Sequence, residues 1–336
     1  MMRNSFAATF ATSIVFACGS AAWAQPAPKD SPTKTSPTSA SREKVYDEAA
    51  DARKDIAAAL SRAERENKRV LIQWGGNWCS WCLKLNELCK RDKNIAHELL
   101  YEYEVVHVDA GKNNKNLDLA QQYQAPVEKE GFPYLTVLDA SGKVIANHET
   151  GSLELKDSNG ESVLGAGAGH DPAKVLKFLQ DHQAPALNAS EVLAAGLSKA
   201  KASDKRVFLH FGAPWCGWCR KLEAWMRRDD VGPMLAKEFV DVKIDTERMT
   251  GGDSVFAKYN ANSKTSGIPW FVFLDSDGKV LAASERTNNG KAENIGFPSA
   301  PDEIATFREM LSRTHMSKDD AAKVVASLQA ASPATH

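Results

Sequence analysis

Four cysteines stand in two pairs with the spacing Cys-x-x-Cys, Cys79 with Cys82 and Cys216 with Cys219. Each pair follows a β-rich run and a short turn, so that a strand delivers the first thiol to the start of a helix. The unpaired N–H groups and the positive dipole end of that helix stabilise a thiolate, which is the attacking form of cysteine. We therefore expect Cys79 and Cys216 to be nucleophiles, and Cys82 and Cys219, one turn later, to resolve the mixed disulfides.

Other uses of paired cysteines fit the sequence less well. Zinc needs four ligands, and no second Cys/His pair at finger spacing accompanies either motif. Haem attachment needs a histidine directly after the second cysteine, where the chain has Leu83 and Arg220. The remaining alternative is that one pair is a permanent disulfide or half of a structural zinc site.

The elements that must position these thiols occur twice in the same order. The first set follows an amphipathic helix over 42–67 and comprises a strand over 69–74, a helix over 79–88, a strand over 104–109, a helix over 117–123, strands over 135–139 and 143–147, and a helix over 172–182. The second set repeats this order, with a strand over 206–211, a helix that includes 215–222, and strands over 240–245, 271–275 and 279–283. The number of residues between the first and the second cysteine pair agrees, to within one residue, with the number between Pro133 and Pro269. This agreement indicates a duplicated domain.

Both halves resemble the thioredoxin family, in which Trp-Cys-x-x-Cys opens a helix and a cis-proline faces it. The resemblance covers about residues 43–183 and 187–315, although Ser80-Trp81 and Gly217-Trp218 replace the usual central Gly-Pro. It implies an α/β fold with two tandem thioredoxin-like domains, each a central mixed β-sheet flanked by helices. It also implies that Phe132-Pro133 and Ile268-Pro269 present backbone to an extended substrate strand.

Further residues near the motifs are interpreted through the same resemblance. Trp81 and Trp218 are expected to be exposed beside the reactive sulfur and to contact substrate, the alternative being that they pack against a neighbouring loop. Thioredoxin has a buried acid where this chain has Gln73 and His210. His210 can serve as a base near neutral pH, or it is simply a hydrogen-bonded core histidine, whereas Gln73 cannot take a proton.

A fifth thiol, Cys89, lies two helical turns after Cys82, at a rise of roughly 10 Å. That distance is too long for a disulfide within the helix. We expect Cys89 to fill the core, with a reactive or intermolecular role as the alternative.

The N-terminus is typical of an exported protein. Arg3, an apolar stretch and Ala22-Trp23-Ala24 indicate a signal peptide over 1–24, which would remove Cys18. The expected organisation continues with a Pro/Ser/Thr-rich linker over 25–42, domains over 43–184 and 187–315, and a C-terminal helical tail over 316–336. The formal net charge of −1 offers no basic excess for nucleic acid, and no later segment could span a membrane.

The sequence thus predicts a periplasmic or secreted thiol–disulfide oxidoreductase that acts on protein disulfides through a mixed disulfide. Without histidine between the cysteines it is more a reductase or isomerase than a strong oxidant. It is expected to use its redox-active disulfides, with no metal and no other cofactor, and an unidentified electron donor or acceptor. The alternatives are a protein that binds a soft metal such as copper through its thiols, and a non-catalytic client-binding module.

Overall fold

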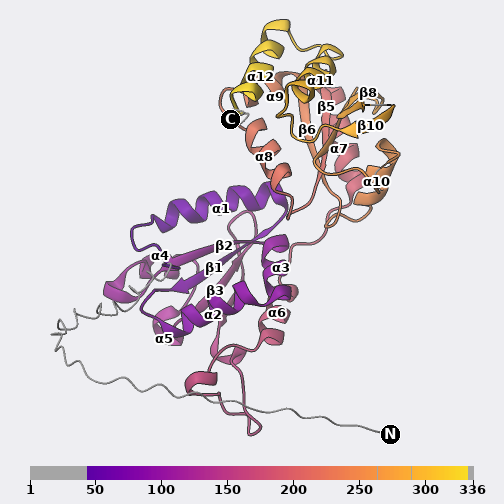
Figure 1. Ribbon diagram of the computed structural model, residues 1–336. Coiled ribbons are helices and arrows are strands. Elements are labelled where there is room, and N and C mark those ends of the chain that lie inside the picture. The colour runs from indigo at the N-terminus through magenta and orange to yellow at the C-terminus, as the bar shows by residue number, and fades with distance from the viewer. Residues whose placement is uncertain (1–43, 263, 289, 332–336) are drawn as a thin grey trace, which may run out of the picture. The chain divides into compact units, whose positions relative to one another are not determined.

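The computed structural model describes residues 44–262, 264–288 and 290–331. The expected signal peptide (1–24), with Cys18, and the linker (25–42) lie outside the described residues. Two segments of the described chain each form a four-stranded mixed sheet flanked by helices (Figure 1). This arrangement confirms the predicted α/β fold class.

The first domain contains four strands in the order β2-β1-β3-β4. β1 pairs with β2 in parallel, and the β1–β3 and β3–β4 pairs are antiparallel. The elements are α1 (Ala52–Glu66), β1 (Arg69–Gly75), α2 (Ser80–Arg91), α3 (Lys93–Glu102), β2 (Tyr103–Asp109), α4 (Leu117–Gln122), α5 (Val127–Glu130), β3 (Tyr134–Leu138), β4 (Val144–Glu149) and α6 (Pro172–Asp181).

Side-chain alternation along β1 divides the core of this domain into two layers. Val70, Ile72 and Trp74 pack against α1 and α4 on one face of the sheet. Leu71 packs with α2, α3 and α6 on the other face. Because both faces are covered, nearly the whole of β1 is buried. The strand therefore holds the start of α2 firmly in place.

The second domain repeats this topology with the strand order β6-β5-β7-β8. β5 again pairs in parallel with β6 and antiparallel with β7. The elements are α7 (Ala189–Ala202), β5 (Arg206–Gly212), α8 (Gly217–Met226), α9 (Gly232–Glu238), β6 (Phe239–Asp245), α10 (Gly252–Tyr259), β7 (Trp270–Leu274), β8 (Val280–Ala283), β9 (Glu285–Asn288), β10 (Lys291–Asn294), α11 (Pro301–Ser312) and α12 (Lys318–Ala331).

The segment expected to be a C-terminal tail is part of the second core. In α12, Val324, Val325 and Leu328 are buried against α8 and α11. The indole N–H of Trp225 donates a hydrogen bond of 2.9 Å to the hydroxyl of Ser327. The packed core of this domain therefore extends beyond residue 315, where the sequence-based boundary was placed.

Each domain carries an inserted segment between its last central strand and the helix that follows. In the first domain the isolated bridges Glu154–His170 and Lys156–Ser162 fold residues 154–170 back on themselves. In the second domain β9 and β10 form a separate two-stranded hairpin. Within the first of these segments, Gly165–Gly167 forms a short 3₁₀ turn.

Candidate active sites

The first Cys-x-x-Cys pair lies at the N-terminus of α2 as a closed disulfide. Cys79 is the N-cap residue, and its sulfur accepts a hydrogen bond of 3.1 Å from the backbone N–H of Cys82. Cys79 is 7 % exposed and Cys82 is completely buried. An incoming thiolate or disulfide can therefore reach Cys79 but not Cys82.

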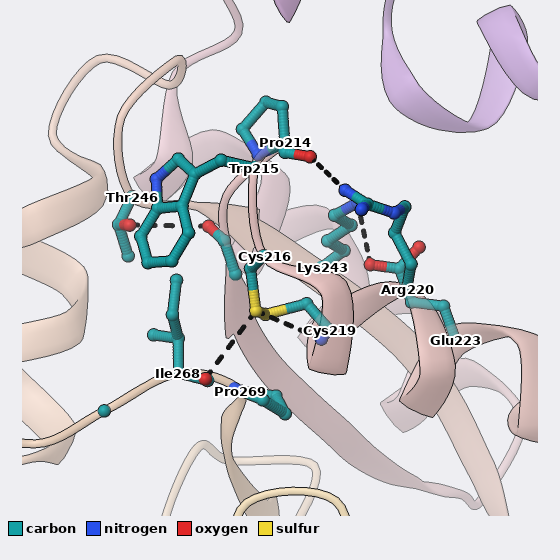
Figure 2. The surroundings of a disulfide bond; sticks show 12 residues. Pro214, Trp215, Cys216, Cys219, Arg220, Glu223, Lys243, Thr246, Ile268 and Pro269 are labelled. Carbon is teal, nitrogen blue, oxygen red and sulfur yellow. Dashed lines mark hydrogen bonds and ion pairs between the residues drawn. A yellow bond between two sulfur atoms is a disulfide. The ribbon is translucent and has the colours of Figure 1, made fainter. Parts of the chain in front are cut away.

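The second pair has the same arrangement at the N-terminus of α8. The sulfur of Cys216 accepts a hydrogen bond of 3.1 Å from the N–H of Cys219. Figure 2 shows the carbonyl oxygen of Ile268 directed at the sulfur of Cys216, at 3.6 Å. The residue before the proline thus faces the reactive sulfur of this domain.

The peptide bonds Phe132–Pro133 and Ile268–Pro269 are both cis. Each proline comes directly before the central strand that pairs with β1 or β5. The cis bonds thus place Phe132 and Ile268 at the same end of each sheet as the cysteines.

The four tryptophans of the two motifs differ in exposure. Trp78, Trp215 and Trp218 are 50 %, 54 % and 54 % exposed. Trp81 differs from expectation because most of its side chain is covered, and its ring forms a T-shaped contact with the ring of His170, with the ring centroids 5.4 Å apart. The inserted segment 154–170 therefore covers part of the apolar surface beside the first disulfide.

The counterpart of Trp81 in the second domain remains open to solvent. Trp218 stacks on Phe297, and the ammonium group of Lys221 lies 4.7 Å from the centroid of the Trp218 ring. One face of this indole is thus occupied from within the domain, while more than half of the side chain stays accessible to a partner.

A group of ionisable side chains lies behind the second disulfide. His210 is buried on β5, and its Nε2 lies 2.9 Å from a carboxylate oxygen of Asp241 on β6. Glu223 lies one turn after Cys219 on the buried face of α8, and Lys243 contacts it at 2.8 Å. Burial alone would raise the pKa of Glu223, but Lys243 and His210 bring it below its usual value, so the carboxylate is ionised.

The first domain has neutral side chains at the matching positions. Gln73 replaces His210, Asn86 replaces Glu223, and His107 replaces Lys243, as the strand registers show. Burial lowers the pKa of His107 to about 4, so this histidine is uncharged at neutral pH. The surroundings of Cys82 and Cys219 are therefore electrostatically different.

Cys89 is the free cysteine of the described residues and is buried on α2. It packs with Leu85, Leu88 and other core side chains of the first domain. Burial raises the pKa of its thiol to about 12, so Cys89 remains protonated and unreactive at neutral pH.

Neither a metal-holding cluster nor a membrane-spanning helix occurs among the described residues. No group of three or more histidine, cysteine, aspartate or glutamate side chains there is arranged to hold a metal ion. Among these same residues no helix has the length and apolar character needed to cross a membrane.

Sequence reasoning identified the cysteines but missed Glu223 and Lys243. The signal for Glu223 is a charged residue on the apolar stripe of a helix, between Leu222 and Met226. Lys243 interrupts the buried strand β6 in the same way. A charge at a core-facing position points to a buried partner of opposite sign.

The mixed sheet, the helix that starts at Cys-x-x-Cys and the cis-proline define a thioredoxin-like domain. In accordance with this, residues 51–140 match a family described as "Thioredoxin-like". Residues 173–329 match a family named for thioredoxin and DsbH and described as "Protein of unknown function, DUF255". The chain therefore contains thioredoxin-like domains.

Relatives with assigned names are similar to parts of the chain. "Disulfide bond reductase DsbH" of Chlamydia pneumoniae is 29 % identical over 99 residues, which are 27 % of this chain and 57 % of that protein. "Protein disulfide-isomerase erp38" of Neurospora crassa is 23 % identical over 233 residues, 68 % of this chain and 55 % of that protein. The chain thus spans little more than half the length of these two relatives.

Among solved structures, a disulphide isomerase from Xylella fastidiosa Temecula1 is 28 % identical, with a TM-score of 0.34. The match covers 41 % of this chain and 95 % of that one.

Proposed function

We propose that the chain is an exported thiol–disulfide oxidoreductase that acts on protein disulfides at both Cys-x-x-Cys sites. The observation that carries the proposal is the pairing, in each domain, of a disulfide at a helix N-terminus with a cis-proline at the same end of the sheet. The exposed tryptophans Trp78, Trp215 and Trp218 supply apolar surface beside the sulfurs for an unfolded or extended client.

The reaction begins from the reduced site. The thiolate of Cys79 or Cys216 attacks a client disulfide, forms a mixed disulfide and releases one client thiolate. Cys82 or Cys219 then loses its proton and attacks the mixed disulfide, which closes the bond within the motif and releases the second client thiol. The client gains two electrons and the site loses two, so an external dithiol donor must reduce the site before the next cycle.

The same residues favour reduction or isomerisation over strong oxidation. The dipeptides between the cysteines are Ser80-Trp81 and Gly217-Trp218, without a histidine that would stabilise the reduced thiolate. The named relatives are a disulfide bond reductase and a protein disulfide-isomerase. Both observations support an enzyme that reduces or rearranges client disulfides.

Export to the periplasm or the cell exterior places this chemistry where client disulfides form. The support is the signal-like sequence ending at Ala22-Trp23-Ala24. Expression in a bacterium and mass spectrometry of the fractionated protein test the proposal. We expect a periplasmic protein that begins at Gln25; a full-length chain retained in the cytoplasm would contradict export.

The activity is tested by the reduction potential of each site. Equilibration with glutathione buffers is measured on the Cys216→Ser chain for the first site and on the Cys79→Ser chain for the second. Potentials near about −270 mV indicate a reductase, whereas values near about −120 mV indicate an oxidant and would overturn the proposed direction. A site that does not cycle reversibly is not an enzymatic site, and the metal-binding or client-binding alternative would then apply.

We further propose that the two sites are unequal because His210 takes up the proton of Cys219 in the second domain. The contact between His210 and Asp241 supports this role, since the carboxylate orients the imidazole ring. The rate of mixed-disulfide resolution is compared with pH for the two sites. We expect different profiles, and a His210→Gln chain should move the second profile towards the first. Superimposable profiles would refute this role.

A further inference from the structure

Tyr46 lies ahead of α1, in the short segment that follows residue 43, and its side chain is completely buried. It forms one cluster of buried side chains with Cys79 and Cys82. A residue far from the motif in sequence is therefore in direct contact with the disulfide of the first domain. Neither the cysteine motif nor the cis-proline pattern indicates this contact.

Gly75 locates the tyrosine hydroxyl with respect to the buried sulfur. A Cβ atom added at Gly75 would lie 2.6 Å from the sulfur of Cys82 and 2.7 Å from the hydroxyl oxygen of Tyr46. The two atoms thus lie beside the same point, at the end of β1. The separation of the hydroxyl oxygen and the sulfur therefore cannot exceed the sum of these two distances.

The segment that carries Tyr46 is anchored by the turn that precedes Cys79. The side-chain oxygen of Asn77 accepts hydrogen bonds of 3.1 Å from the backbone N–H groups of Val45 and Tyr46. The amide nitrogen of Asn77 donates a bond of 2.7 Å to the carbonyl oxygen of Tyr46. Three hydrogen bonds from one side chain therefore fix Tyr46 relative to the active site.

The hydroxyl of Tyr46 has no hydrogen-bond partner among the described residues. A buried hydroxyl without a partner is unfavourable, and most such groups in folded proteins are paired. In the closed disulfide the sulfur of Cys82 is a poor acceptor, but after reduction it is a thiol or thiolate with free lone pairs. The missing partner is therefore supplied when the disulfide opens.

We propose that Tyr46 donates a hydrogen bond to the sulfur of Cys82 in the reduced first domain, and so stabilises the thiolate that resolves the mixed disulfide. The inference rests on the proposed function, because it assumes that this disulfide is opened and closed. The proton of Cys82 leaves to solvent or client, since the tyrosine keeps its own.

The groups around Tyr46 are suited to donation. Burial, reinforced by Cys89 and Asp109, raises the pKa of the Tyr46 hydroxyl, so it remains protonated. The ring of His107 packs edge-on against Tyr46, with centroids 5.4 Å apart, and is uncharged at neutral pH. Asp109 is paired with Lys115 at 2.9 Å. Among the described buried side chains clustered with Cys82, Tyr46 supplies the hydroxyl donor.

The described residues of the second domain form no equivalent of the contact between Tyr46 and the buried cysteine. Pro214 stands at the position of Asn77 and has no side-chain amide with which to anchor a preceding segment. A Cβ atom at Gly212, the counterpart of Gly75, would have only atoms of Cys219 within 4 Å in the described structure. The inference therefore applies to one site of the chain and not to the other.

The test uses the full chain carrying Cys216→Ser and Cys219→Ser, so that only the first site cycles. Its equilibrium with glutathione is compared with that of the same chain carrying Tyr46→Phe, which keeps the ring and removes the hydroxyl. A hydrogen bond made only in the reduced form should shift the equilibrium constant about tenfold towards the disulfide when it is lost, which is about 30 mV for this couple. Resolution of a preformed mixed disulfide should slow by a similar or smaller factor.

Tyr259→Phe is the matched control, because the hydroxyl of Tyr259 is also buried without a partner but lies on α10 of the second domain. It should leave the equilibrium unchanged. Asn77→Ser removes the hydrogen bonds that hold Tyr46 in place but keeps the tyrosine. It should shift the equilibrium in the same direction as Tyr46→Phe, and it replaces that variant in the test if the Tyr46→Phe chain does not fold.

If the first site cycles and Tyr46→Phe changes its equilibrium by less than about twofold, or towards the dithiol, the role of Tyr46 is refuted while the proposed activity stands. If the parent site does not cycle at all, both fail.

Discussion

Replacement of His170 by phenylalanine should make the first domain less sensitive to acid. His170 is 4 % exposed, and neither ring nitrogen has a hydrogen-bond partner among the described residues. Burial, with a smaller contribution from Lys84, lowers its pKa from 6.5 to about 4, although Glu154 opposes this. In the unfolded chain the ring titrates near its ordinary pKa and takes up a proton that the folded domain excludes.

The sign and size of the effect follow from this difference. Because the folded pKa is depressed, the stability contribution is fully present above pH 6.5 and is lost as the pH falls towards 4. A gap of about 2.5 pKa units at about 1.4 kcal/mol each limits the loss to about 3 kcal/mol. Between pH 7.5 and 4.5 the parent chain should lose about 2 to 3 kcal/mol through this residue, and the His170→Phe chain should not.

Hydrogen exchange of the backbone amides of β3 measures the stability of this domain within the intact chain. After correction for intrinsic exchange rates, the fall in protection at pH 4.5 should be about 50- to 100-fold smaller in His170→Phe than in the parent. His97→Phe, which replaces an exposed histidine of α3, should behave like the parent. An equal fall in protection in the parent and His170→Phe would refute the reasoning.

Three further outcomes are expected from the described packing. Leu328→Ala should reduce the free energy of unfolding of the second domain by about 2 to 5 kcal/mol in urea titrations, whereas Gln329→Ala on the exposed face of α12 should change it little; equal effects would mean that α12 is not part of that core. In the reduced folded protein, Cys89 should react with iodoacetamide at pH 8 at least tenfold more slowly than the motif cysteines, as followed by peptide mass spectrometry, and comparable rates would contradict its burial. Gly196→Ala should destabilise the second domain by about 1 to 3 kcal/mol, because its Cβ atom would lie 2.3 Å from Val242; an unchanged unfolding midpoint would show that α7 can shift at no cost.

Local patterns account for the parts of the fold that the sequence predicted. The buried runs of β1 and β5 and the helices at Cys79 and Cys216 are visible as apolar strands followed by turn residues. Helix α3 was not predicted, yet a local signal exists, since Asp92 caps it by accepting hydrogen bonds from the N–H groups of Asn94 and Ile95. The hairpin of β9 and β10 was missed although Asn288 is followed closely by Gly290, a composition typical of such turns.

Other features depend on contacts between residues distant in sequence. The hydrogen bond from Trp225 to Ser327 and the packing of His170 on Trp81 join segments that no periodicity relates. The same holds for the pairing of His210 with Asp241, which requires the register of β5 and β6. The cysteine motifs and the candidate residue His210 could therefore be read from the chain, whereas these contacts between distant segments could not.

The position of Tyr46 has a practical consequence for the transfer of this domain to other proteins. Similarity to the thioredoxin-like family begins at residue 51, after the tyrosine and after the backbone groups that Asn77 holds. A graft or chimera cut at that point would retain the sheet, both cysteines and the cis-proline. It would lack the hydroxyl beside Cys82. A reduction potential measured on such a fragment would therefore not be that of the disulfide in the parent chain.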